Sequence, residues 1–196
     1  MSPRIGLDPE SVLAAAAELA DEQGFEAVTL ATLAQKLSIR PPSLYNHIQG
    51  LPDLRVKLAV YGIDRLHTAL EEAIQGREGD EAVFALSEAY ITFARRHPGL
   101  YAASQRHHNR KETGIQLAAE RTFQLVGSVL KEAYGLKGDT AIHAMRGLRS
   151  VLHGFASLER EGGFGIGLSV DESLKVITAA FIAGMRTLRR DHSLES

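Results

Sequence analysis

The residues best suited to act on another molecule gather in one short segment of this 196-residue chain. Segment 40–47 reads Arg-Pro-Pro-Ser-Leu-Tyr-Asn-His, which combines a cation, an amide, two hydroxyls and an imidazole. Arginine pairs well with guanine and asparagine with adenine, whereas hydroxyl groups often bind phosphate oxygens. These side chains indicate contact with nucleic acid.

Two short helices are expected to hold this segment. Thr29 is expected to cap the first helix, whose apolar residues recur at helical spacing. These apolar residues are Leu30, Leu33, Ala34 and Leu37. Pro41 and Pro42 fit the first positions of a second helix, where an N–H group would lack an intrahelical partner. Leu44 and Ile48 then face the core, and the pair forms a helix-turn-helix, whose second helix lies in the DNA major groove.

The same region resembles the DNA-binding domain of TetR-family transcriptional regulators. The resemblance rests on Leu-Ala-Gln-Lys-Leu at 33–37, Ser-Leu-Tyr-Asn-His-Ile at 43–48 and Pro-Asp-Leu at 52–54. It implies that certain side chains contact phosphate, namely Thr29, Ser43, Tyr45 and His47. It also implies that others lie closest to base edges, namely Arg40, Pro41 and Asn46. The alternative is that Tyr45 and His47 merely cover a small core.

Three positions depart from the pattern that the resemblance implies. Arg40 stands where the family usually has a capping Ser or Thr, and Ser38 stands where it commonly has Gly. Leu51 replaces a lysine that many members carry at the start of the fourth helix. We therefore expect Arg55 or Lys57 to supply the corresponding phosphate contact.

Composition limits the other possible chemistry. The chain is 44% hydrophobic and 23% charged, and it has no cysteine, which excludes disulfides, thiolate zinc sites and thiol nucleophiles. The early run 12–20 contains Glu18 and is flanked by acids, unlike a signal peptide. No apolar stretch reaches membrane-spanning length. We expect a cytoplasmic protein that has no membrane partner.

The formal net charge of −2 gives no whole-chain argument for DNA binding. Acids concentrate before the candidate motif, whereas Lys36, Arg40, Arg55 and Lys57 outnumber Asp53 within and just after it. We expect a mildly basic local surface with few phosphate contacts per subunit. Such a subunit needs a second copy for adequate affinity.

Helical signals continue along the whole chain, so the expected fold class is all-α. We expect a three-helix DNA-binding domain over 1–51 and a helical regulatory and dimerisation domain over 52–196, joined by a long fourth helix that starts at Pro52. The expected N-caps are Asp8, Asp80, Asp139 and Ser169. The expected later helices cover 80–96, 100–105, 111–134, 139–161 and a final segment from 170.

The last two helices carry small residues that let backbones approach closely, which favours a homodimer interface. The candidate interface residues are Gly147, Val151, Gly154, Phe155, Ala180, Phe181 and Gly184. Ordinary packing within one chain is the alternative. The stretches 97–101, 152–155 and 162–165 resemble the C-terminal domain of a TetR subgroup named for a Trp-His-Gly motif, although Leu152 replaces the Trp.

The eight histidines do not have the spacing of a metal site. His143 and His153 lie on different faces of one helix, and His107 and His108 are adjacent in a polar loop. The glycine-rich run 162–167 lacks the preceding strand that a dinucleotide-binding loop needs. No catalytic residue, metal or cofactor is therefore expected.

The hypothesis that joins these observations is a homodimeric repressor that a small-molecule effector releases from a palindromic DNA operator. Aromatic side chains with few polar groups typically line cavities in helical bundles. The candidate pocket residues are Tyr61, Phe84, Tyr101, Phe123 and His153. Two alternatives remain: a DNA-binding regulator or activator without a ligand, and a helical small-molecule carrier that does not bind DNA.

Overall fold

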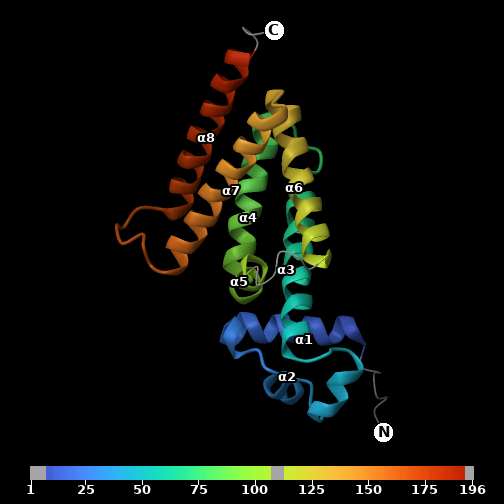
Figure 1. Cartoon of the computed structure of the whole chain (residues 1–196). Coiled ribbons are helices and arrows are strands. Elements are labelled where there is room, and N and C mark those ends of the chain that lie inside the picture. The colour runs from blue at the N-terminus through green and yellow to red at the C-terminus, as the bar shows by residue number, and fades with distance from the viewer. Residues whose placement is uncertain (1–7, 107–112, 193–196) are drawn as a thin grey trace. The chain divides into compact units, whose positions relative to one another are not determined.

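A computed structural model describes residues 8–106 and 113–192 of the chain. Within these ranges every regular element is helical and there is no strand, which confirms the expected all-α fold (Figure 1). The chain forms two compact units. Unit 1 comprises Met1–Arg65 and Arg96–Ala119, and unit 2 comprises Leu66–Arg95 and Glu120–Ser196. The expected functional boundary between 51 and 52 remains a prediction, and unit 1 extends beyond it because later segments pack with the first helices.

Unit 1 is built around the start of the chain. Its elements are α1 (Pro9–Gln23), η1 (Phe25–Ala27), α2 (Leu30–Lys36), η2 (Pro41–Asn46), the first part of α3 (Leu51–Ile74), α5 (Pro98–Gln105) and the first part of α6 (Thr113–Tyr134). Asp8 caps α1 as expected, since its carboxylate accepts a hydrogen bond from the Ser11 N–H at 2.8 Å. The α3 and α6 segments share a buried apolar cluster of Ala59, Ile63, Ile115 and Ala118.

The two helices of the expected motif form, but the second is a 3₁₀-helix. Thr29 caps α2 through a reciprocal pair of hydrogen bonds with Thr32, at 2.9 and 3.1 Å. Pro41 and Pro42 occupy the first positions of η2, and Arg40 gives it no side-chain cap. The first donors are therefore missing, and the segment closes with tighter bonds between residues three apart. In the turn before it, Ser38 has φ +55°, a conformation that glycine adopts more readily.

Unit 2 contains α4 (Gly79–Arg96) up to Arg95, α7 (Gly138–Arg160), α8 (Val170–His192) and the later parts of α3 and α6. Its buried apolar side chains include Leu70, Leu86, Leu130, Leu148 and Leu152. Ser169 caps α8 as expected, because its hydroxyl accepts from the Glu172 N–H at 3.2 Å.

Two of the expected caps are wrong. The helices begin one residue earlier than expected, at Gly79 and Gly138, so Asp80 and Asp139 lie inside the first turn. Asp80 instead accepts a hydrogen bond from the buried Tyr134 hydroxyl at 3.0 Å and pairs with Arg186. Burial and the Asp80 carboxylate raise the pKa of Tyr134 well above its usual value. A tertiary contact thus uses the carboxylate that local sequence assigned to capping.

Candidate nucleic-acid interface

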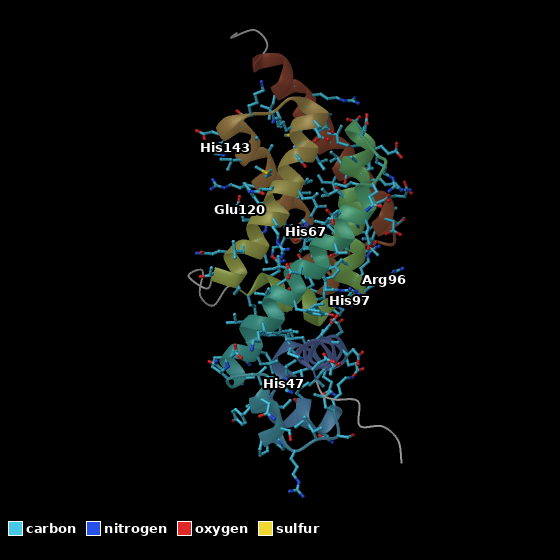
Figure 2. All side chains as sticks on the ribbon, turned by 90° about the vertical axis from the view of Figure 1, so that its right-hand side faces the viewer. His47, His67, Arg96, His97, Glu120 and His143 are labelled. Atoms are coloured by element: carbon cyan, nitrogen blue, oxygen red, sulfur yellow. The ribbon has the colours of Figure 1, made fainter. Side chains whose placement is uncertain are left out.

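The outward side of η2 carries nearly all the side chains expected to meet DNA. Leu44 and Ile48 are buried and fix the segment to unit 1. The exposed residues are Arg40, Pro41, Ser43, Tyr45 and Asn46, and His47 is half-buried (Figure 2). Tyr45 is 60% exposed, so it does not serve as the cover of a small core. A short helix with this surface can place hydroxyl, amide and guanidinium groups in a groove.

The end of η2 is tied to the first turns of α3. The Lys57 ammonium donates to the His47 carbonyl oxygen and to the Asp53 carboxylate, each at 2.9 Å. Asp53 also accepts from the Gln49 N–H at 2.7 Å. Burial opposes ionisation of Asp53, but these hydrogen bonds outweigh it and lower its pKa. The ammonium of Lys57 is thus engaged within the protein, and its expected contact with phosphate remains a prediction.

The expected mildly basic surface needs correction. The Lys36 ammonium lies 3.0 Å from Glu22, and Arg55 lies 3.0 Å from Glu26. The Arg55 guanidinium also stacks over the Phe25 ring, 5.5 Å from its centroid. These cations are neutralised by carboxylates, as Lys57 is by Asp53. Arg40, by contrast, forms no ion pair with any other residue that the structure describes, so it carries the uncompensated charge of η2.

Helix α5 is seated against both α1 and α3 within unit 1. The Asp21 carboxylate at the end of α1 accepts from the Leu100 N–H at 2.8 Å and lies 2.9 Å from the His97 Nδ1 (Figure 2). A Cβ added at Gly99 would lie 1.9 Å from the Ala20 carbonyl oxygen. On the other side, a Cβ at Gly62 of α3 would lie 2.8 Å from the Leu100 carbonyl oxygen. Close backbone contact therefore fixes α5 to the helices that carry η2.

Sequence reasoning missed this arrangement. The sequence pattern predicts a short helix over 100–105, whereas α5 begins at Pro98. The available signal in the sequence was Pro98, which suits the first position of a helix, preceded by a residue that is not a usual N-cap. The first N–H groups of such a helix need a hydrogen-bond acceptor from elsewhere in the fold. Asp21 supplies it from 79 residues away in sequence.

His67 is a second residue that the sequence did not single out. It lies on α3, in the part that belongs to unit 2, and its buried Nδ1 atom has no hydrogen-bond partner among the residues that the structure describes (Figure 2). Buried polar atoms in native proteins are almost always satisfied, by protein groups, water or a ligand. The available signal was a histidine beside the apolar Leu66 and Leu70 on a core-facing helix.

The five expected pocket residues are not gathered in one unit. Tyr61 and the buried Tyr101 belong to unit 1, whereas Phe84, Phe123 and His153 belong to unit 2. Phe123 is on the surface of its unit. Burial, together with Arg149 and Arg160, lowers the pKa of His153 and favours its neutral form. The pocket set remains a prediction.

Besides the face that packs in the core of unit 2, α7 and α8 each carry an apolar stripe that is at least partly exposed to solvent. The α7 stripe is Gly147, Val151, Gly154 and Leu158, and the α8 stripe is Ile177, Phe181, Gly184 and Leu188. In both stripes the residues are separated by four, three and four positions, the spacing of helices that pack at a shallow angle. All eight residues are at least partly exposed.

The two stripes lie next to each other within one chain. Most of the expected interface residues belong to these stripes or lie beside them, whereas one is buried. A Cβ at Gly147 would lie 3.6 Å from the Phe181 ring, whereas a Cβ at Gly154 would meet nothing within 4 Å. Ala180 is exposed beside the α8 stripe. Phe155, by contrast, is buried in its own chain. The interface residues remain predictions.

The described residues contain no cluster of three or more histidine or acidic side chains that could hold a metal. His107 and His108 lie outside the described ranges. Within the described part of the chain, no helix combines the length and apolar character needed to cross a membrane.

Comparison with known proteins gives matches at both ends of the chain. Residues 12–48 match the family described as bacterial regulatory proteins, tetR family, and residues 83–181 match the tetracyclin repressor-like, C-terminal domain. An uncharacterized HTH-type transcriptional regulator, YobS of Bacillus subtilis (strain 168), is 41% identical over 185 residues, which are 94% of this chain and 96% of YobS.

Solved structures with low sequence identity share the fold. SCO7222, a TetR transcriptional regulator from Streptomyces coelicolor, matches with a TM-score of 0.75 and 20% identity, over 93% of this chain and 99% of that one. A TetR variant from Acinetobacter baumannii AYE in complex with minocycline matches with a TM-score of 0.68 and 24% identity, over 93% and 98%.

Proposed function

The chain belongs to the TetR family of DNA-binding transcriptional regulators, and we propose that it acts as a homodimeric repressor released from a palindromic operator by a small-molecule effector. Regulators of this family are generally non-enzymatic, and the proposal gives the chain no catalytic residue and no cofactor. It places the protein in the cytoplasm with its operator DNA. Family membership sets aside the alternative of a carrier that ignores DNA.

The exposed face of η2 is the observation that carries the proposed mode of DNA recognition. Tyr45, Ser43 and His47 would bind phosphate oxygens and fix the register of the segment. Arg40 would read a guanine and Asn46 an adenine, whereas the Pro41 ring offers only apolar contact with a thymine methyl group. Arg40 is suited to base readout because no carboxylate among the described residues competes for it.

The α7 and α8 stripes support a homodimer. A two-fold axis places the same surface of each copy against the other, so two stripes on one protomer become four packed helices in the dimer. The glycines at Gly154 and Gly184 would allow these helices to approach closely. Two η2 segments would then read half-sites roughly 34 Å apart, or a multiple of that distance.

Two features support regulation by an effector. The unpartnered Nδ1 of His67 gives unit 2 a polar atom that an otherwise apolar ligand would satisfy. His67 lies on α3, whose first turns hold the end of η2 through Lys57. If α3 or α5 can adopt two arrangements, a ligand that binds one arrangement more tightly would shift the population toward it. The structural neighbour from Acinetobacter baumannii AYE is a complex with minocycline, so a protein of this fold can hold a small molecule.

A thermal-shift screen over drugs and metabolites tests the effector proposal, followed by measurement of DNA release. The duplex for the second step is one that the protein itself enriches from a random library. An effector should raise the melting temperature of the wild type and reduce its DNA affinity. The same compound should lose most of its shift with His67→Ala. A regulator without a ligand would show no compound that changes DNA affinity, and that result would refute release by an effector.

A further inference from the structure

The connection between α7 and α8 is strongly apolar and open to solvent. Residues 162–168 read Gly-Gly-Phe-Gly-Ile-Gly-Leu, and we call them the apolar arm. All seven residues are exposed, with Ile166 at 79% and Leu168 at 74%. Figure 1 shows this connection swinging away from the two helices that it joins. Large side chains so exposed on neighbouring positions typically mark a surface that another molecule covers.

The base of the apolar arm has a defined geometry. The N–H groups of Gly162 and Gly163 donate to the carbonyl oxygens of Glu159 and Leu158, at 3.1 and 2.7 Å. Gly162 has φ +72°, so these contacts form the glycine-dependent motif that ends many helices. The Phe164 ring then packs against Phe155, with centroids 4.9 Å apart. The direction in which the arm leaves α7 is therefore set by the fold.

Glycines separate the large apolar side chains of the apolar arm. Phe164, Ile166 and Leu168 alternate with glycines, and a tight turn joins the last two, since the Leu168 N–H donates to the Ile166 carbonyl oxygen at 2.7 Å. The intervening glycines allow close approach of a neighbouring surface to the backbone. The arm also begins next to Leu158 of the α7 stripe, which is itself half-exposed. The open apolar surface of α7 thus continues into the arm.

The charges at the two ends of the apolar arm narrow the choice of what covers it. The arm itself has no charged residue, and Glu161 precedes it while Asp171 and Glu172 follow shortly after. Each of these acids is paired within its own chain, because Glu161 lies 3.6 Å from Arg160, Asp171 lies 2.7 Å from Arg95 and Glu172 lies 2.8 Å from Lys175. The apolar arm thus offers no unpaired charge to an ionic surface, whereas the apolar α7 and α8 stripes of a second copy match its side chains.

We propose that the apolar arm is a dimerisation element, in which Ile166 and Leu168 pack against the second copy of the chain and extend the interface of α7 and α8. The inference rests on the proposed homodimer. Because a two-fold interface is self-complementary, each dimer contains two arms and buries four of these side chains. The connection between the helices thus contributes directly to the affinity of the dimer.

The first test is the dimer dissociation constant of the double variant Ile166→Ser with Leu168→Ser, measured by sedimentation velocity. Loss of four buried apolar side chains should weaken the dimer by at least about 100-fold. Leu117→Ser is the control, because Leu117 is an exposed apolar residue of α6 outside the proposed interface. It should leave the constant unchanged. A double variant that dimerises like the wild type overturns the role of the arm, whereas a wild type that is monomeric overturns the homodimer itself.

The second test does not depend on a destabilising change. The chain has no cysteine, so Ile166→Cys gives one labelling position for an environment-sensitive dye. Dye emission should shift to the blue as the protein concentration rises through the dimerisation range. A label at Leu117→Cys should show no such shift. If the dye at position 166 emits as it does in water although the sample is dimeric, the proposal is contradicted. A blue shift that appears only when lipid vesicles are added would also contradict it.

Discussion

The carboxylate of Asp21, in the last turn of α1, accepts a hydrogen bond from the backbone N–H of Leu100 in the first turn of α5. Helix α5 has no capping side chain of its own, so a residue of the helix that supports η2 completes it. Since Gly99 also brings α5 into backbone contact with α1, we expect the two helices to move together. A displacement of α5 would therefore be transmitted to the DNA-binding helices.

Removal of this cap should destabilise unit 1 and weaken DNA binding without altering η2. We expect Asp21→Ala to lower the free energy of unfolding by about 1 to 2 kcal/mol, the usual cost of losing an N-terminal cap. Urea titration measures the change, and Glu132→Ala, an exposed acid on α6, is the control. Equal stability of the two variants would show that the contact does not hold α5 in place.

Lys57 distinguishes a positioning role from a phosphate contact. If its ammonium mainly holds the His47 carbonyl, Lys57→Gln should lower stability by about 1 kcal/mol and weaken DNA binding at every salt concentration alike. If Lys57 binds phosphate, the slope of log affinity against log salt should decrease by about 1. DNA titrations at four or more salt concentrations measure that slope. We expect it to be unchanged, and a reduced slope would contradict the positioning role.

Gly154 tests the homodimer from the helix side. Outside the neighbouring backbone of α7, a Cβ at this position would meet no atom of the described residues within 4 Å, so we expect the isolated chain to tolerate Gly154→Leu. The same side chain should hold the paired helices apart and shift the protein toward monomer in sedimentation velocity. Ala119→Leu adds similar bulk at an exposed position of α6 and should leave the dimer intact. A Gly154→Leu protein that remains as dimeric as the wild type would refute packing through the α7 stripe.

His153 should make stability depend on pH in a predictable direction. Burial and two arginines lower its pKa in the folded chain, so below about pH 6.5 the unfolded chain binds more protons than the folded one. Its contribution to stability is therefore complete above that pH and decreases as the pH falls. Urea titrations at pH 8.0 and 5.5 should show a smaller loss for His153→Gln than for the wild type. Identical losses would mean that His153 does not contribute.

Local features of the fold were predictable from the sequence, because their causes lie within a few residues. Thr29 and Ser169 cap the helices that they precede, and the apolar spacing gave the buried side of η2. The exposed side of η2 followed from the same pattern. Asp80 was misassigned because Tyr134, a distant residue, uses its carboxylate.

Long-range contacts were beyond sequence reasoning for the same physical reason. A count of nearby charges predicted a basic surface, but Glu26 pairs with Arg55 across 29 positions of sequence. The partnership of Asp21 with α5 spans 79 positions. Whether the buried Nδ1 atom of His67 has a hydrogen-bond partner depends on the positions of all the described residues around it. None of these is determined by periodicity or local propensity.

The most direct measurement is in vitro selection from random duplex DNA, at a stated salt concentration, with the wild type, Tyr45→Phe and Arg40→Ala. The wild type should enrich an inverted repeat. Tyr45→Phe should lower affinity for all sequences about equally, and Arg40→Ala should relax one base position in each half-site, at a cost of about 1 to 3 kcal/mol. Folded wild-type protein that enriches no inverted repeat at low salt would contradict the proposed homodimeric reading of DNA by η2.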